Sequence, residues 1–332
     1  MSKKHRRRRS WGRTALGIVF VAAAVYAGAH CLFRAPEIAA SGISAQEGPS
    51  QTSQSTPRED EAAAALAAHE ERKPNFYTIL ISGVDDGNGG SDTNILVAVD
   101  AENGKIHGVS IPRDTKAVIA GKNRKINFAY NSGGASLLAE TVGTQLGIPV
   151  DFTVTVDLDG FIALVDAIGG VDFYIPVNMD YDDPLQGLSI HYQKGQRHLN
   201  GRQAMEVVRF RHNTDTSVVA YGNEDIGRMS TQQEFLKAVA KQTLTLSNVD
   251  KIGQFAKIFQ QYVDTDLTVG NLAWLGKEAI SMGTDSITFS TLPGEWKSPY
   301  IYLDKEATLS LVNESLNPYV EDRVMADLDI PS

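Results

Sequence analysis

This sequence lacks disulfide-forming cysteines and the short motifs of several common enzyme classes. Cys31 is the only cysteine among 332 residues, so no disulfide can form within the chain. An exported domain would therefore depend on its hydrophobic core for stability. There is no Gly-x-Ser-x-Gly, no His-Glu-x-x-His and no phosphate-binding loop ending in Gly-Lys-Ser/Thr. These absences exclude the usual serine hydrolase, zinc protease and P-loop nucleotide hydrolase patterns.

Basic residues are also scarce beyond the N-terminus. Residues 1–13 hold seven of the 31 Lys and Arg residues and no acid. The rest of the chain has 24 bases against 40 acids, a formal charge of −16. A nucleic-acid-binding domain carries a basic footprint, which this distribution does not provide. We therefore expect no nucleic acid among the partners.

An uncharged segment follows the basic tail at once. Residues 14–33 contain no Asp, Glu, Lys or Arg. At about 1.5 Å per residue this segment is long enough to cross the hydrocarbon core of a membrane. Basic residues beside a span stay in the cytoplasm. We predict a cytoplasmic tail at 1–13, a transmembrane helix at 14–33 and a membrane-attached, extracytoplasmic remainder.

A cleaved signal peptide is the alternative interpretation of the same segment. Ala27-Gly28-Ala29 fits a small-x-small cleavage site after an apolar stretch of suitable length. Both interpretations place the rest of the chain outside the cytoplasm. They differ in whether it stays attached to the membrane.

Composition divides the remainder into a spacer and one domain. Residues 34–73 begin with a stretch rich in Ser, Gln, Pro and Gly and end in an alanine-rich one. This composition predicts a flexible spacer, with a short helix at 61–73 as an open alternative. Residues 74–332 show no internal repeat and no further linker, so we expect them to form a single extracytoplasmic domain.

Hydrophobic patterning in this domain predicts alternating strands and helices. The segment Glu102-Asn103-Gly104 predicts a β-hairpin. The predicted strands are 76–81, 94–100, 105–111, 152–156, 171–175 and 286–292. The predicted helices are 134–146, 159–168, 202–208, 228–246, 250–263, 268–282 and 305–316. The alternation predicts an α/β fold, a central mixed β-sheet with helices on both faces.

Two carboxylates flank a glycine-rich loop between predicted strands. Asp85 follows one strand and Asp92 precedes the next, so both should lie on loops at one sheet edge. Mg²⁺ prefers oxygen ligands and often shares its shell with phosphates. These carboxylates are thus a candidate magnesium site. An ordinary turn is the other interpretation, because Asp, Asn and Gly dominate turns.

Four arginines from distant segments could surround an anion. Arg113 ends a strand, while Arg209 and Arg211 share a parity and would point the same way on an extended backbone. Arg228 lies three residues after Asp225, on the same face of a predicted helix. The planar guanidinium binds phosphate oxygens bidentately. Surface ion pairs are the alternative for Arg113, and Asp225 could simply favour a helix N-terminus.

A series of short strings runs in order from about residue 75 to 240. They are Leu80-Ile81-Ser82-Gly83-Val84-Asp85, Ser91-Asp92-Thr93, Ser110-Ile111-Pro112-Arg113-Asp114-Thr115, Lys125-Ile126-Asn127, Ala129-Tyr130, Asp159-Gly160-Phe161, Gly169-Gly170-Val171, Leu199-Asn200-Gly201-Arg202-Gln203-Ala204, Arg209-Phe210-Arg211 and residues 225–233. Together they resemble the successive signatures of the LytR-CpsA-Psr family. Each string alone is weak, and the ordered set is specific.

The resemblance implies an enzyme of the cell wall. Members of this family are membrane-anchored phosphotransferases that move a glycopolymer from an undecaprenyl-pyrophosphate carrier onto peptidoglycan. The polymer is wall teichoic acid, capsular polysaccharide or another secondary wall polysaccharide. The expected partners are therefore the polyprenyl-pyrophosphate-linked glycopolymer, peptidoglycan and membrane lipid. An apolar pocket for the polyprenyl chain is also implied.

The resemblance also implies roles for single residues. Asp85 and Asp92 would hold Mg²⁺ as the cofactor. The pyrophosphate would be bound by Arg113, Lys125, Arg209, Arg211, Arg228 and Gln232. The catalytic residues would be Arg113, Asp114 and Asp225. Whether either aspartate orients an arginine or accepts a proton stays open.

The sequence departs from the family pattern at two places. Many relatives have an arginine within the loop that is Asp86-Gly87-Asn88-Gly89-Gly90 here, and often another where Thr231 stands. These changes predict a less positive phosphate site. Two rival functions also remain: a polyprenyl-pyrophosphate pyrophosphatase, and a non-catalytic membrane regulator or polysaccharide-binding protein.

Overall fold

The computed structural model describes residues 34–38, 70–84, 90–185, 187–215, 217–218, 220–221, 224–243 and 261–332. No helix within these ranges is long and apolar enough to cross a membrane. The span predicted at 14–33 lies outside the described residues.

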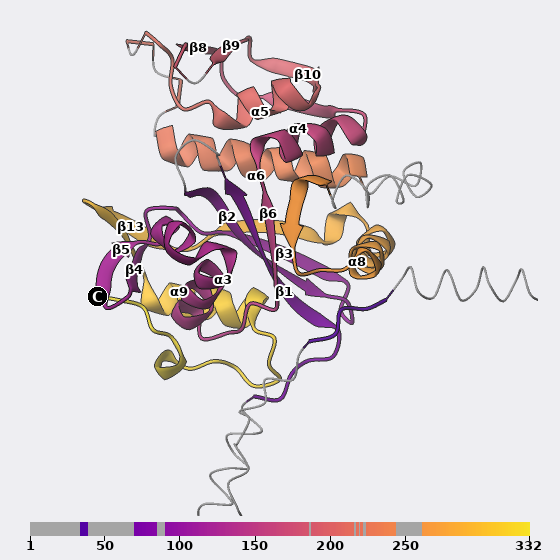
Figure 1. The fold of residues 1–332 in the computed structure, drawn as a ribbon, viewed down its shortest axis with the longest axis vertical. Coiled ribbons are helices and arrows are strands. Elements are labelled where there is room, and N and C mark those ends of the chain that lie inside the picture. Colours follow the sequence, from indigo (N-terminus) through magenta and orange to yellow (C-terminus); the bar gives the residue numbers. More distant parts are fainter. Residues whose placement is uncertain are drawn as a thin grey trace, which may run out of the picture.

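The centre of the fold is a mixed six-stranded sheet in the order β11-β6-β1-β2-β3-β12 (Figure 1). Its strands are β1 (Phe76–Val84), β2 (Ser91–Asp100), β3 (Lys105–Ser110), β6 (Phe152–Val156), β11 (Val263–Thr265) and β12 (Ile287–Thr291). Strands β1, β2 and β3 pair antiparallel, as the predicted hairpin requires. Strand β6 runs parallel to β1 and β12 parallel to β3, whereas β11 is antiparallel to β6. The prediction of a central mixed sheet is confirmed.

Helices cover both faces of this sheet. The helices are α3 (Asn127–Leu146), α4 (Leu158–Ala167), α5 (Gly201–Arg209), α6 (Glu224–Thr243), α8 (Val269–Met282) and α9 (Lys305–Leu311). On one face, Leu138 of α3 packs in a core with Leu80 and Leu96. On the other face, Trp274 of α8 packs against Tyr77 and Phe152. The alternation of side-chain direction along β1 supplies apolar residues to both faces of the sheet from one strand.

A second core sits at the end of the central sheet, above the carboxyl ends of β1 and β6 (Figure 1). It is built from α4, α5 and α6 together with β7 (Val171–Ile175), β8 (Met179–Asp183), β9 (Leu188–Tyr192) and β10 (Gly195–Leu199). Phe210 and Phe235 are buried in it. Strands β7 and β10 form one two-stranded sheet, and β8 and β9 form another. This layer closes the upper side of the sheet.

Some predicted boundaries are wrong. Helix α3 begins at Asn127, seven residues before the predicted start, because Gly133 and Gly134 break its geometry without ending it. The helix predicted at 250–263 ends too late, since Val263 already pairs in β11; residues 250–260 lie outside the described residues. Helix α6 starts at Glu224 rather than Arg228.

Several short strands were not predicted at all. Four of them form two hairpins, β4 (Lys116–Ile119) with β5 (Lys122–Lys125), and β13 (Gly294–Lys297) with β14 (Tyr300–Leu303). Strands β8, β9 and β10 were not predicted either. Most of these sequences are polar or mixed and lack the apolar runs on which strand prediction depends, whereas β14, Tyr-Ile-Tyr-Leu, is apolar but only four residues long.

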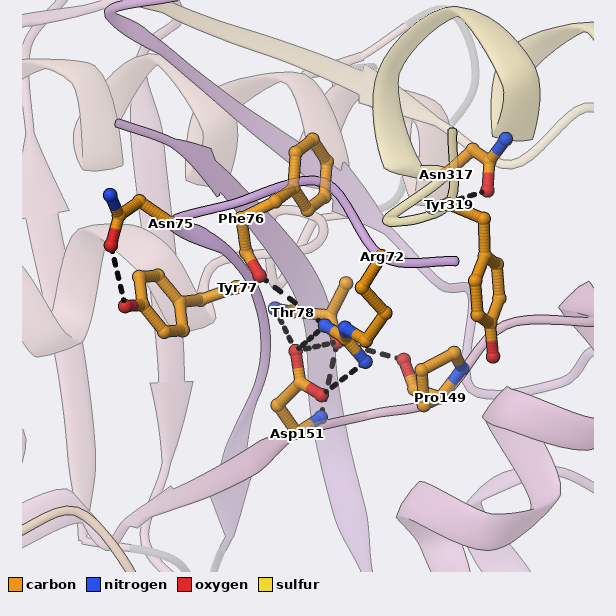
Figure 2. A network of polar contacts seen from close by, with 9 residues as sticks. All are labelled: Arg72, Asn75, Phe76, Tyr77, Thr78, Pro149, Asp151, Asn317 and Tyr319. Atoms are coloured by element: carbon orange, nitrogen blue, oxygen red, sulfur yellow. Dashed lines mark hydrogen bonds and ion pairs between the residues drawn. The ribbon is translucent and has the colours of Figure 1, made fainter. Parts of the chain in front are cut away.

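The folded unit includes residues that precede 74. Arg72 makes a bidentate ion pair with Asp151, at 2.9 and 2.8 Å, and Asp151 also accepts from the Thr78 amide and hydroxyl (Figure 2). The Lys73 amide donates to Pro318. The last residues of the predicted spacer are thus held against the domain.

The first residues of the spacer are held too. The Arg34 amide donates to Gly270, and the Asn271 side chain donates to the Arg34 carbonyl. Ile38 packs on the core beneath α8. Residues 34–38 therefore lie against the N-terminal end of α8.

Candidate active site

A cavity of about 800 Å³ opens where the second core meets the central sheet. Its floor is the α8-side face of β1, β2 and β6, and α4, α6 and α8 form its walls. The interior is lined by apolar side chains, including Ile81, Val154, Phe161, Leu236 and Ile280. Gly276 of α8 also lines it, and a Cβ placed there would meet no atom within 4 Å. The interior therefore suits a long apolar ligand.

The mouth of this cavity is charged. Asp92, Gln232 and four arginines line it, although they come from four separate segments. Those arginines, called the arginine cradle below, are Arg113, Arg209, Arg211 and Arg228. The structure thus brings to one place residues that are far apart in the sequence and that the sequence alone linked only by their residue type. Their binding of phosphate stays a prediction.

Local structure explains how the cradle is built. Arg113 follows the end of β3, where Ile111 pairs with Asn94 of β2. Arg209 is the last residue of α5, and Phe210 is extended with φ −62° and ψ 133°. The buried Phe210 side chain holds this segment between two arginines that point toward the cavity. Gln232 of α6 donates to the Val208 carbonyl and so ties α6 to the end of α5.

A line of alternating charges runs outward from the mouth. The Arg113 guanidinium donates to Asp92 at 2.7 Å, and its Nε lies 3.9 Å from the Asp114 carboxylate. Lys125 Nζ lies 2.8 Å from the other oxygen of Asp114. Asp114 and Lys125 do not line the cavity among the described residues. Asp114 therefore has the geometry of a residue that orients Arg113.

Two predicted site residues are not described at the side-chain level. Asp85 lies outside the described residues. The backbone of Asp225 belongs to the first turn of α6, but its side chain is outside the described part. Within the described ranges, no group of three His, Cys, Asp or Glu side chains could hold a metal ion.

The chemistry around Asp92 nevertheless fits a hard divalent cation. Its carboxylate lies at the cavity mouth and its side chain is half exposed. Ser91 and Asn94 of the same strand are buried and do not line the cavity, so the donor set at this point rests on the Asp92 carboxylate itself. Oxygen donors of this kind suit Mg²⁺, which needs few protein carboxylates when phosphates and water complete its shell.

Of two further cavity-lining residues, the sequence interpretation missed Tyr181 and took His212, beside the arginine segment, as structural or exposed. Tyr181 of β8 and His212 line the mouth, with ring centroids 5.3 Å apart. Partial burial and the nearby Asp183 raise the pKa of Tyr181, so its hydroxyl stays protonated and can donate. Hairpin β8–β9 was not predicted, and nothing in its acidic sequence indicates a cavity. His198 does not line the cavity; it is an exposed residue of β10 and pairs with Asp172 of β7.

The departure at Thr231 does not affect the cradle. Thr231 is buried on the opposite side of α6, where its hydroxyl interacts with Tyr221 and donates to the Gly227 carbonyl. It does not line the cavity. The residue present at this position is thus a buried threonine that contributes no atom to the mouth. Of the other departure, only Gly90 is described.

The comparisons with known proteins agree with this arrangement. The model of the LytR_cpsA_psr family matches residues 42–317. The chain belongs to the LytR_cpsA_psr family. The matched residues include those that line the cavity, the arginine cradle, and the hairpins β4–β5, β8–β9 and β13–β14.

Two relatives of this family member are polyisoprenyl-teichoic acid–peptidoglycan teichoic acid transferases. TagV of Bacillus subtilis is 32% identical over 267 residues, and TagU of Bacillus cereus is 36% identical over 201 residues. These matches cover 75% and 59% of this chain. The chain spans about two thirds of the length of these curated relatives, 66% of TagV and 62% of TagU.

The fold is shared with a solved member of the family. The crystal structure of B. subtilis TagV matches with a TM-score of 0.63 at 29% identity, over 74% of this chain and 98% of the TagV chain. The mixed sheet with flanking helices is therefore the fold of the LytR_cpsA_psr family.

Proposed function

We propose that this protein is a phosphotransferase that moves a glycopolymer from a polyprenyl-pyrophosphate carrier onto peptidoglycan. The observation that carries the proposal is one cavity with an apolar interior and four arginines at its mouth. This combination matches a ligand with a hydrocarbon tail and a multiply charged phosphate head. The names of the TagV and TagU relatives support the same donor and acceptor.

The proposed reaction is an in-line displacement at phosphorus. An acceptor hydroxyl of peptidoglycan forms a bond to the phosphorus that carries the glycan, and the bond to the bridging pyrophosphate oxygen breaks. The lipid monophosphate leaves with the electron pair, and the hydroxyl proton passes to a carboxylate, Asp114 or Asp225, and from there to water. Phosphoryl transfer depends mostly on positioning and on charge stabilisation. The arginine cradle would supply both.

Single residues have distinct proposed parts. Arg209, Arg211 and Arg228 would hold the pyrophosphate oxygens, with the Gln232 amide beside them. Arg113 would contact the reacting phosphate, held in place by Asp92 and Asp114 on either side. Lys125 would act through Asp114, which it neutralises, because its ammonium does not reach the cavity. Asp225 would lie close to the head group, near Arg228 in the first turn of α6.

We propose Mg²⁺ as the cofactor, held by Asp92 and Asp85. When bound, the cation would neutralise charge on the pyrophosphate and on the leaving phosphate. Asp92 would then share its carboxylate between the cation and Arg113. That sharing fits its half-exposed position at the mouth.

We also propose that residues 14–33 anchor the chain in the membrane, with the domain outside. The substrate carrier is a membrane lipid, so an anchored enzyme meets it in two dimensions. Protease treatment of cells stripped of their wall should digest residues 34–332. A protected domain would contradict this topology, and a soluble form beginning near His30 would favour the signal peptide.

A transfer assay separates the proposed function from its rivals. Full-length protein in detergent would be incubated with a lipid-pyrophosphate glycan, peptidoglycan and Mg²⁺. Polymer linked to peptidoglycan is the expected product. Free polymer phosphate without peptidoglycan product would indicate the pyrophosphatase. If there is no turnover, the remaining interpretation is a non-catalytic membrane regulator or polysaccharide-binding protein.

A further inference from the structure

An aromatic hairpin projects beside the cradle. In Figure 1, β13 extends from the edge of the molecule next to β4 and β5. Its Trp296 is 55% exposed, although tryptophan side chains are highly buried on average. Tyr300 and Tyr302 of β14 are only partly buried, with ring centroids 6.3 Å apart. Aromatic side chains so placed in water mark surfaces that bind a ligand.

The hairpin is joined directly to the catalytic segment. The Ile301 amide donates to the Asp114 carbonyl at 2.9 Å, and Ile301 bridges Thr115. Lys125, which pairs with Asp114, has its ammonium 5.9 Å from the centre of the Trp296 ring. A chain of contacts through Asp114 and Lys125 thus connects Arg113 to Trp296. A ligand lying on Trp296 would be close to the reacting phosphate.

Basic side chains surround the exposed ring. Strand β5 has the sequence Lys-Asn-Arg-Lys, and its first three residues are exposed. The Arg124 guanidinium lies 5.3 Å from the centre of the Phe128 ring, which is itself 41% exposed. The aromatic–basic platform, as we call it, consists of Phe128, Arg124, Lys125 and Trp296; Tyr300 lies on the other face of the hairpin, because Trp296 pairs with Ile301. The platform offers flat apolar faces next to positive charges.

This combination matches an amino-sugar strand with acidic peptide stems. The apolar C–H face of a pyranose ring stacks on an aromatic ring, and arginine and lysine pair with carboxylates. Peptidoglycan offers such faces at every sugar along its length together with carboxylates on its peptide stems, whereas a polyol-phosphate donor offers few sugar faces and a polysaccharide donor has no peptide stems. The chemistry of the platform therefore favours the acceptor strand over the donor polymer.

The position of the platform points the same way. In an in-line displacement the attacking hydroxyl approaches from the side opposite the leaving group. The leaving lipid phosphate would lie toward the apolar cavity, so the acceptor should come from the outer side of Arg113. That is the side on which Asp114, Lys125 and Trp296 follow one another.

The attachment of the N-terminal segment is consistent with this direction. Residues 34–38 dock on α8, on the opposite side of the central sheet from β13 (Figure 1). With the proposed anchor ending just before Arg34, the membrane would be on the α8 side. The platform would then face away from the membrane, toward the cell wall.

We propose that the aromatic–basic platform is the acceptor subsite, where a peptidoglycan strand stacks on Trp296 while its peptide carboxylates pair with Arg124. The inference rests on the proposed function, since it assigns one of the two substrates of that reaction. Trp296 positions the acceptor, and the arginine cradle performs the transfer.

The decisive experiment compares Trp296→Ala with Tyr174→Ala in the full-length protein. Tyr174 is a matched control because it is 53% exposed on β7, away from this hairpin. Trp296→Ala should raise the KM for soluble peptidoglycan strands by about tenfold or more, as loss of a central aromatic contact does. The KM for the lipid-linked donor should stay unchanged. Tyr174→Ala should change neither constant.

Other results would overturn the proposal. A rise in the donor KM alone would place the donor polymer on the platform. Unchanged constants together with weaker binding to anionic lipid vesicles would make Trp296 a membrane contact. Arg124→Gln gives a further readout: it should weaken binding of strands that carry peptide stems and leave stem-free strands unaffected.

Direct binding separates failure of this inference from failure of the proposed function. Co-sedimentation with purified, polymer-free peptidoglycan needs no turnover. Binding that is lost in Trp296→Ala and kept in Tyr174→Ala would support the platform even for a protein without transferase activity. Binding equal in wild type and Trp296→Ala would refute the platform even for an active enzyme.

Discussion

The guanidinium of Arg113 lies 2.7 Å from the carboxylate of Asp92, across the mouth of an apolar cavity. One residue is a predicted phosphate ligand and the other a predicted metal ligand. Each therefore influences the position and charge of the other. Variants at the two positions must be compared with one another before either role is assigned.

The arginine cradle should not tolerate lysine. Arg113→Lys, Arg209→Lys and Arg211→Lys keep the charge but lose the bidentate fork. Each should lower the transfer rate about ten- to hundredfold, since a lost charge-assisted hydrogen bond costs about 1.5–3 kcal/mol. Steady-state transfer assays measure this. Arg202→Lys is the control, because Arg202 is on α5 with a side chain 70% exposed. Near-wild-type rates in the three variants would show that the cradle does not contact the reacting phosphates.

Loss of the Asp92 carboxylate should weaken binding of Mg²⁺. Asp92→Asn keeps the size of the side chain and removes a charged oxygen ligand. Calorimetric titration with Mg²⁺ should show at least a tenfold weaker affinity, about 1.4 kcal/mol, with the same expectation for Asp85→Ala. Arg113→Lys should leave Mg²⁺ affinity near wild type, and Asp172→Asn is the charge control, because Asp172 is an exposed residue of β7. Equal Mg²⁺ affinity in wild type and Asp92→Asn would remove Asp92 from the metal site.

A side chain introduced at Gly276 would extend into the apolar interior of the cavity, and its Cβ would not clash with any atom. Gly276→Ala should stabilise α8 by up to about 1 kcal/mol, because glycine is a poor helix residue and the new Cβ meets no atom within 4 Å. Gly276→Phe should fill part of the cavity instead. It should raise the KM for a full-length polyprenyl donor while a donor with two isoprene units is affected less. Equal effects on both donors would contradict the assignment of the cavity to the lipid chain.

Acid should destabilise the fold partly through His107. Its imidazole contacts the hydroxyls of Thr288 and Ser290 across β3 and β12, at 2.6 and 2.9 Å. Burial lowers the pKa of His107 below its ordinary value of 6.5. The unfolded chain therefore takes up the proton first, so this contribution to stability is present above pH 6.5 and declines as the pH falls below it.

Denaturant unfolding at pH 7.5 and 5.5 measures that contribution. The loss of unfolding free energy between the two values should be smaller in His107→Gln than in wild type. His191→Gln should do the opposite, because the hydrogen bond that His191 donates to Asp180 raises the pKa of His191 and favours its protonated form in the folded state. An identical loss in wild type and His107→Gln would show that His107 does not contribute.

The pair Arg72–Asp151 should be a major contributor to stability. The Asp151 side chain is 2% exposed and accepts hydrogen bonds from both Arg72 and Thr78 (Figure 2). Asp151→Ala leaves the guanidinium without its partner, which costs about 3–5 kcal/mol when such a pair is buried. The exposed pair Lys297–Glu295 is the control, and Glu295→Ala should change stability by about 0.5 kcal/mol or less. Equal losses in the two variants would show that the buried pair is not important.

The parts of the fold that could be predicted are those with a local signal. Strands β6 and β7 match their apolar runs residue for residue, and α8 follows from Thr268, whose side chain caps it. The hairpin β13–β14 could not be predicted, because it depends on pairing with the Asp114 segment. Polar strands such as β5 have no periodicity of their own to read.

The same distinction applies to the site. Residue type and order grouped the four arginines, and folding brings them to one cavity mouth. Sequence could not tell that Lys125 reaches Asp114 instead of the cavity, or that Thr231 faces the other side of α6. Both outcomes depend on the direction of a side chain within its element, which is set by packing between distant segments.

The docking of residues 34–38 on α8 changes what the predicted spacer can do. A tether sets how far a domain can move from its anchor, and its reach grows with its length. Here Arg34 and Arg72 both contact the domain, so residues 39–69 connect two points on its surface. Their length has no influence on the distance between domain and bilayer. With residues 14–33 as the proposed anchor, the domain would be held at a fixed height above the lipid surface, and the acceptor would have to come within that height.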